Sequence, residues 1–138
     1  MEKPKKFKIL LVDDEDIFRE ATARQLSVRG FQVLTAGSGP EALDLVKSDP
    51  PEVVVLDQMM PEMSGSEVFA EIKKLNPLIE IIMLTGNTSV DDAVELMQLG
   101  TFDYLMKPVN IEELLYKIED AHARKQLNER RGAADAAS

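Results

Sequence analysis

Short apolar runs alternate with longer amphipathic segments along most of the chain, and this alternation restricts the possible folds more than any other feature. The five runs have the length and composition of strands and cover residues 7–12, 32–36, 53–56, 79–84 and 104–106. They are almost continuously apolar instead of alternating between apolar and polar residues. Such runs are typical of strands covered on both faces, as in a parallel sheet.

The segments between these runs have the spacing of helices. The third is the clearest, because apolar residues repeat with helical spacing over 68–75, and Ser64 and Glu67 are placed as a capping box. The first segment is expected to end at Gly30 and the fourth at Gly100. In the fourth, we expect the buried residues to be Ala93, Val94 and Met97.

Five strand–helix units predict an α/β fold of the (βα)5 type. Because crossovers between parallel strands are right-handed, the expected structure is a doubly wound, five-stranded parallel sheet with the flavodoxin-like order 2-1-3-4-5. In such sheets ligands bind beyond the carboxyl ends of the strands. After Ala121 the apolar repeat stops. We expect residues 124–131 to extend the last helix as a solvated face and residues 132–138 to form a flexible tail.

The composition excludes several classes of function. At 138 residues the chain has room for one sizeable core. It carries 16 Lys and Arg against 25 Asp and Glu, a net charge of −9, which disfavours direct binding to nucleic acid. The absence of cysteine excludes disulfides and thiolate metal sites. No signal peptide and no apolar run near the ~20 residues of a membrane span is present, so we expect a cytoplasmic protein without a membrane partner.

Charged and hydroxyl side chains follow four of the five strand candidates. Asp13 and Asp14 close the first run, Asp57 the third, Thr85 the fourth and Lys107 the fifth. Converging carboxylates repel one another unless a cation neutralises them, and oxygen ligands without His or Cys favour Mg²⁺. This set suits phosphoryl transfer onto the carboxylate of Asp57, with Lys107 and Thr85 contacting the phosphoryl oxygens.

These residues lie in motifs that resemble a family. The chain is similar to a bacterial two-component response-regulator receiver domain of the chemotaxis-regulator type, over about residues 6–123. Any one motif is weak, but their order and spacing together are specific. The matching motifs are Ile9-Leu10-Leu11-Val12-Asp13-Asp14-Glu15, Val54-Val55-Leu56-Asp57 with Met60-Pro61 and Ser64-Gly65, Met83-Leu84-Thr85-Gly86, and Tyr104-Leu105-Met106-Lys107-Pro108.

The resemblance implies a mechanism. Asp57 would accept a phosphoryl group from a sensor histidine kinase or a phosphotransfer protein and later lose it by autodephosphorylation, without turnover of a separate substrate. Asp13, Asp14, Asp57 and the main-chain carbonyl of Met59 would surround Mg²⁺. The peptide bond between Lys107 and Pro108 would be cis. Thr85 and Tyr104 would switch a face built from the fourth helix, the fifth strand and the fifth helix, which would bind a downstream protein or a second copy.

Some residues depart from the usual pattern of that family. Gln58, Met59, Gly86 and Asn87 stand where other residues are more common. The position of Met59 influences the lifetime of the phosphoryl group in the family. Because Met59 has no charge to orient water, we expect it to favour a long-lived phosphorylated state.

Other readings remain open for parts of the sequence. A haloacid-dehalogenase-like hydrolase would need an acid where Met59 stands, and an FMN-binding flavodoxin would need a phosphate loop where Asp13 and Asp14 stand. A phosphorylation-independent, receiver-like binding module is the remaining alternative, although the chain retains every residue of the site. Away from the site, we expect His122 to be solvated, and Met60 and Met63 to be loop or core fillers.

Overall fold

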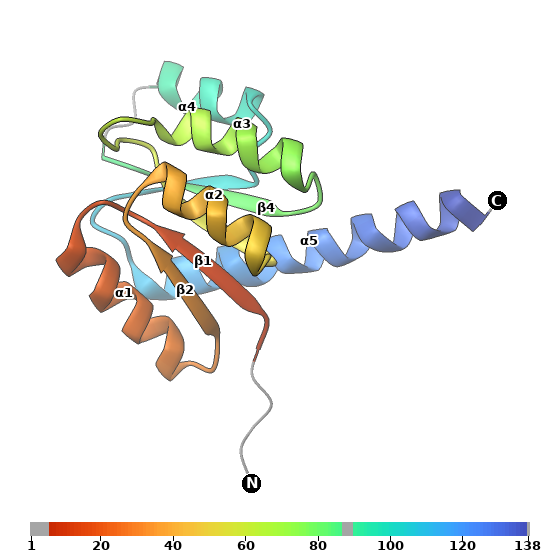
Figure 1. Ribbon diagram of the computed structural model, residues 1–138, viewed down its shortest axis with the longest axis horizontal. Helices are drawn as coiled ribbons and strands as arrows, with labels where there is room; N and C mark the ends of the chain where they lie inside the picture. The colour runs from red at the N-terminus through yellow and green to blue at the C-terminus, as the bar shows by residue number, and fades with distance from the viewer. Residues whose placement is uncertain (1–5, 87–89, 138) are drawn as a thin grey trace, which may run out of the picture.

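The computed structural model describes residues 6–86 and 90–137, and strands and helices alternate through this part of the chain (Figure 1). The five strands are β1 (Lys8–Val12), β2 (Gln32–Ala36), β3 (Val53–Asp57), β4 (Glu80–Thr85) and β5 (Asp103–Met106). The five helices are α1 (Asp16–Val28), α2 (Gly39–Ser48), α3 (Gly65–Leu75), α4 (Val90–Gln98) and α5 (Ile111–Ala137).

The strands form one parallel sheet in the order β2-β1-β3-β4-β5. The order reverses after β1, so the carboxyl ends of β1 and β3 lie next to each other, with Val12 paired with Leu56. On the other side of β3, Asp57 pairs with Leu84 of β4. The predicted fold class and strand order are therefore confirmed, and the register brings the ends of β1, β3 and β4 to one edge.

Two apolar cores lie on the two faces of the sheet. Successive strand residues point to opposite faces, so Leu10, Val54 and Ile81 pack against α2, α3 and α4, while Ile9 and Val55 pack against α1 and α5. All five of these side chains are completely buried. The uninterrupted apolarity of the strands thus has the predicted cause, which is that both faces are covered.

Polar side chains cap the starts of three helices. The hydroxyl of Ser64 accepts a hydrogen bond from the Glu67 amide at 3.3 Å, as the capping-box pattern predicts. Ser38 caps α2 in the same way. The side chain of Asn110 accepts from the Glu113 amide at 3.1 Å at the start of α5. These caps fix where α2, α3 and α5 begin.

The buried side of α4 differs from the prediction. Val94 is 48% exposed and Met97 is 46% exposed, whereas Leu96 is buried. The structure places α4 over the edge strand β5, and Val94 and Met97 line an open hollow beside Tyr104 instead of packing into the core. The apolar spacing predicts a helix here but cannot decide which apolar residues face the sheet. The side chain of Ala93 and the whole of Asn87 lie outside the described residues.

The last helix is longer than the sequence suggests. It continues to Ala137 and leaves the body of the domain (Figure 1), so residues 132–137, expected to be a flexible tail, are helical. Four of these six residues are alanine, the residue with the highest helix propensity, which offsets Gly132. None of the helices in the described part of the chain is both long and apolar enough to cross a membrane.

Two side chains of α5 that were expected in solvent are instead packed. Lys125 is only 7% exposed and forms ion pairs with Glu52, at 2.8 Å, and with Glu129. The ring of His122 stacks on Phe7 with 3.7 Å between ring centres. The prediction of a solvated His122 is therefore wrong, because α5 crosses the starts of β1 and β3 at this point.

Candidate functional site

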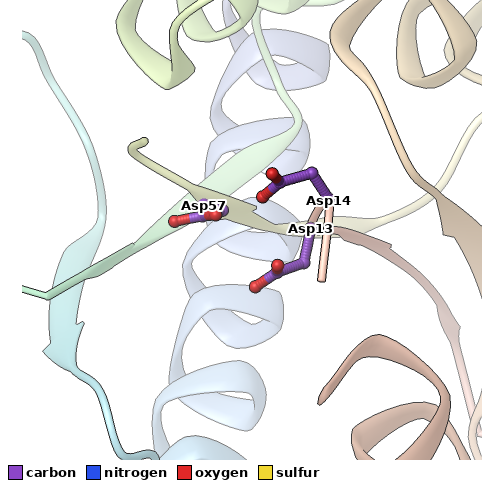
Figure 2. A group of neighbouring side chains, drawn as sticks. All are labelled: Asp13, Asp14 and Asp57. Atoms are coloured by element: carbon purple, nitrogen blue, oxygen red, sulfur yellow. The ribbon is translucent and has the colours of Figure 1, made fainter. Parts of the chain in front are cut away.

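Acidic side chains meet at the carboxyl edge of the sheet. Asp57 is the last residue of β3, and Asp13 and Asp14 directly follow β1 (Figure 2). One carboxylate oxygen from each of the three lies within 4.8 Å of the other two. Asp13 is completely buried and Asp57 is only 4% exposed, so two acids that would each be costly to desolvate share one buried place.

Burial and crowding change the acidity of Asp57. Desolvation is the main cause that raises the pKa of this carboxyl group from 3.8 to about 6, and the nearby charge of Asp13 adds to it. The charge of Lys107 and the amide of Met59, which lies 3.3 Å from Asp57 Oδ1, act in the opposite direction. The ionised form of Asp57 is therefore disfavoured until a further positive charge arrives.

Lys107 is the cation of the site. Its ammonium nitrogen lies 2.8 Å from Asp13 Oδ2, 3.0 Å from Glu15 Oε1 and 3.5 Å from Asp57 Oδ2. Burial alone would lower the pKa of Lys107, but its contacts with Asp13 and Glu15 and the charge of Asp57 raise it above its usual value. Lys107 is therefore a fixed positive charge, and it cannot balance all of the acids around it.

The backbone holds these side chains in place. The peptide bond between Lys107 and Pro108 is cis, as expected, and the Lys107 amide donates to the carbonyl of Thr85 at 2.9 Å. The guanidinium of Arg19 donates to the carbonyl of Asp13 at 2.8 Å. At the start of α3, a Cβ on Gly65 would lie 2.5 Å from the carbonyl oxygen of Asp57. Only glycine fits this close approach of helix and strand.

The site residues suit a hard divalent cation. Asp13 Oδ1 accepts from the Glu15 amide at 2.9 Å, and the buried Oδ2 lies 2.8 Å from the Lys107 ammonium without a well-directed hydrogen bond among the described residues. A buried acceptor in this state, beside two further carboxylates, is a position where a cation would be stabilised. The donors are all oxygens, which Mg²⁺ prefers. Asp13, Asp14 and Asp57 are thus the residues that could hold it.

The chain matches a known protein family over most of its length. Residues 9–119 match the family model described as the response regulator receiver domain. The chain belongs to that family. It is 43% identical over 111 residues to the response regulator MprA of Mycolicibacterium vanbaalenii, a match covering 80% of this chain and 48% of that protein. The receiver domain therefore spans about half the length of the curated relatives that it matches.

Solved receiver structures superpose closely on this receiver domain. A receiver domain protein from Clostridium thermocellum is 38% identical, with a TM-score of 0.83 over 88% of this chain and 98% of that one. A CheY-like receiver domain protein from Methanospirillum hungatei is 30% identical, with a TM-score of 0.82 over 91% of this chain and 99% of that one. The chemotaxis-regulator-type fold of the domain agrees with the sequence-based interpretation.

The predicted site residues are only partly gathered in one place. Asp13, Asp14, Asp57 and Lys107 lie together, and buried Thr85 ends the strand next to Asp57. The side chain of Met59 points into solvent and is 75% exposed, and the role of its carbonyl stays a prediction.

Tyr104 lies apart from the acids. It is half-buried on β5 and lines a hollow of about 390 Å³ with Val94 and Met97 of α4. Its role as a switch, like that of Thr85, stays a prediction.

Two contacts of Lys107 were not foreseen from the sequence. Glu15 pairs with its ammonium, and the ring of Phe18 lies with its centre 4.7 Å from the same nitrogen. Glu15 continues the acidic run that begins at Asp13, which was a usable signal. Phe18 has the spacing of a core residue of α1, so nothing in the sequence distinguishes it from packing.

Proposed function

We propose that this receiver domain is the phosphoacceptor of a two-component system and that Asp57 accepts the phosphoryl group from a sensor histidine kinase or a phosphotransfer protein. The observation that carries the proposal is the convergence of Asp13, Asp14 and Asp57, with Asp13 and Asp57 buried and both within 3.5 Å of the Lys107 ammonium. The excess of negative charge at this group would be neutralised by a bound cation, and it suits a phosphoryl group that binds together with Mg²⁺. The family relation supports the same reaction, and cytoplasmic localisation would go with it.

The transfer would proceed by attack of an Asp57 oxygen on phosphorus. The new P–O bond forms as the bond to the donor nitrogen breaks, and the leaving imidazole keeps the bonding pair and takes up a proton. The ammonium of Lys107 would stabilise charge on the phosphoryl oxygens, and the hydroxyl of Thr85 would donate to another of them. Mg²⁺ held by Asp13, Asp14, Asp57 and the Met59 carbonyl would neutralise charge and favour ionised Asp57.

Phosphorylation would act on a protein-binding face. It adds about −1.5 to −2 charges at Asp57. Thr85 and Tyr104 would respond and alter the face formed by α4, β5 and α5. Val94, Met97, Met106 and Tyr116 on these elements are each more than a third exposed. Such a patch is suited to contact a downstream protein or a second copy of the chain, whereas water would later release the phosphate at the same site.

Labelling by acetyl phosphate in the presence of Mg²⁺ tests the proposed reaction. We expect one phosphoryl group per chain, lost with EDTA and absent in Asp57→Asn. Asp44→Asn, which removes an acid of α2 outside the site, is the control and should be labelled normally. Label that persists in Asp57→Asn would exclude Asp57 as the acceptor, and an unlabelled but correctly folded wild type would favour a phosphorylation-independent binding module.

The exposed side chain of Met59 predicts a slow loss of the phosphoryl group. It lies two residues after the acceptor and offers no hydrogen bond that would orient an attacking water. Replacement by Asn or Glu should therefore accelerate the decay of the labelled protein by about tenfold, the effect of a modest change in barrier. The decay is timed after removal of the donor. An unchanged or slower decay in both variants would contradict this role of Met59.

A further inference from the structure

Lys107 has a second set of contacts, on the α1 side of the site, that phosphoryl transfer does not use. Its ammonium nitrogen lies 3.0 Å from Glu15 Oε1 and 4.7 Å from the ring centre of Phe18. The oxygen of Asp57 is farther away than that of Glu15, at 3.5 Å. The lysine that would bind the phosphoryl group is therefore held, in this state, at least as closely by α1 as by the acceptor.

The side chain of Glu15 contacts Lys107 and does not cap α1. Glu15 occupies the N-cap position, where Ser, Thr, Asp or Asn would normally cap the helix, and its side chain makes no capping hydrogen bond. It reaches instead to Lys107, 92 positions later in the chain. The start of α1 therefore has no side-chain cap, and the N-cap residue Glu15 pairs instead with the lysine of the site.

Phe18 supplies the other side of this contact. Its ring lies within the range in which an aromatic face attracts an ammonium ion. The same ring lines a hollow of about 600 Å³ between α1 and the segment that follows β5, together with Thr22, Pro108 and Ile111. The ammonium of Lys107 thus has Glu15 and the ring of Phe18 on its α1 side, next to open space, and Asp13 Oδ2 at 2.8 Å on its other side.

We propose that Glu15 and Phe18 form a resting seat for the Lys107 ammonium and that these positioning residues determine how readily Lys107 engages a phosphoryl group on Asp57. This inference rests on the proposed function. The contacts with Glu15 and Phe18 draw the ammonium toward the α1 side of the site, so they compete with a phosphoryl oxygen for its charge. The seat therefore competes with the phosphoryl group, and its removal should strengthen the engagement of Lys107.

The seat can be observed without any phosphoryl donor. In metal-free protein carrying ¹³Cε-labelled lysine, the ring of Phe18 should shift the Lys107 Hε resonance upfield of the other lysines. Phe18→Leu should abolish this shift, Glu15→Gln should reduce it, and Phe18→Tyr, which keeps the ring, should retain it. Lys107→Arg assigns the signal. A Lys107 resonance among those of the other lysines, unchanged in Phe18→Leu, would overturn the proposal.

The consequence is measured by labelling with acetyl phosphate at saturating Mg²⁺. Glu15→Gln should increase the rate about two- to fivefold, the range for an exposed ion pair, and Phe18→Leu by a similar factor. Asp16→Asn is the matched control, because it removes the same charge from a neighbouring residue that pairs with Arg19 and not with Lys107. Phe18→Tyr and Asp16→Asn should keep the wild-type rate. Equal rates in Glu15→Gln and Asp16→Asn would overturn the positioning role.

The two measurements separate this inference from the function on which it rests. A wild type that takes no label would refute the proposed phosphoryl transfer, whereas the Lys107 resonance of the metal-free protein still decides whether the seat exists. Glu15 is 66% exposed on its side chain, so Glu15→Gln should fold even where Phe18→Leu loses stability. Thermal unfolding of each variant identifies such a loss.

Discussion

The charged side chains at the two ends of the sheet differ in how their charges are balanced. At the carboxyl end, Asp13, Asp57 and Glu15 all contact the single ammonium of Lys107. At the amino end, three different cations pair with the acids nearest the strands. The pairs there are Lys8 with Asp49, Arg124 with Glu80, and Lys125 with Glu52.

This difference separates structural charges from functional ones. At the amino end, the ion pairs of Arg124 and Lys125 connect α5 to the starts of β4 and β3, and Lys8 connects β1 to the end of α2. The unbalanced acids of the carboxyl end oppose folding, as the raised pKa of Asp57 shows, and would be relieved by a bound cation. The contrast predicts that changes at the two ends have opposite effects on stability.

The largest effect is expected from Gly65, which keeps the acids of the carboxyl end together. In Gly65→Ala, the new Cβ would meet the carbonyl oxygen of Asp57 at 2.5 Å and Gln58 Cα at 2.7 Å. Because both are backbone atoms, strand and helix must separate, and the free energy of unfolding should fall by about 3 kcal/mol. Chemical denaturation measures it. Gly86→Ala is the control, since a Cβ there meets nothing within 4 Å; equal losses would contradict the close-approach argument.

Removal of the Asp57 charge should stabilise the metal-free domain. The folded-state pKa of about 6 lies above the usual 3.8, so the folded protein binds the proton more tightly than the unfolded chain. The resulting stability is fully present below pH ~3.8 and is lost as the pH rises through about 6. The difference corresponds to at most about 3 kcal/mol. In EDTA at pH 8, Asp57→Asn should therefore gain about 2 kcal/mol.

Magnesium provides the control for this prediction. Denaturation curves of the wild type at pH 8 and pH 5 should differ in the stated direction, whereas those of Asp57→Asn should show less pH dependence. Added Mg²⁺ should stabilise the wild type more than the variant, because the variant has lost one of the acids that would bind it. If Asp57→Asn is less stable than the wild type at pH 8, the charge of Asp57 does not destabilise the folded domain.

Neutralising an acid at the amino end should have the opposite sign. Glu80 is 4% exposed, 3.8 Å from the guanidinium of Arg124. Glu80→Gln keeps the shape but removes the charge that both Arg124 and Lys73 face, so we expect a loss of about 1 kcal/mol in the free energy of unfolding. The same denaturation experiment at pH 8 measures it. A gain in stability, as expected for Asp57→Asn, would remove the distinction between the two ends.

The sequence predicts the carboxyl end better than the amino end for a physical reason. Asp13, Asp57, Thr85 and Lys107 each close an apolar run, and a parallel sheet brings such positions to one edge whatever the side chains do. The pairing of Lys125 with Glu52 depends instead on where α5 crosses the sheet, which periodicity does not determine. The exposure of Val94 and Met97 was missed for the same reason, because it follows from the position of α4 at the edge.

His122 belongs to the amino end, and its burial predicts the smallest effect. Desolvation lowers its pKa below 6.5, although Glu52 opposes this. The folded protein therefore binds the His122 proton less tightly than the unfolded chain, so stability is lost as the pH falls from about 6.5 through the lowered pKa, by no more than about 1.4 kcal/mol per pH unit. Asp57 titrates in a similar pH range and changes stability in the opposite direction. The effect of His122 should therefore be measured in the Asp57→Asn background. Adding His122→Phe to Asp57→Asn preserves an aromatic ring against Phe7 and should reduce the loss of stability as the pH falls. If the loss is unchanged, another titrating group causes it.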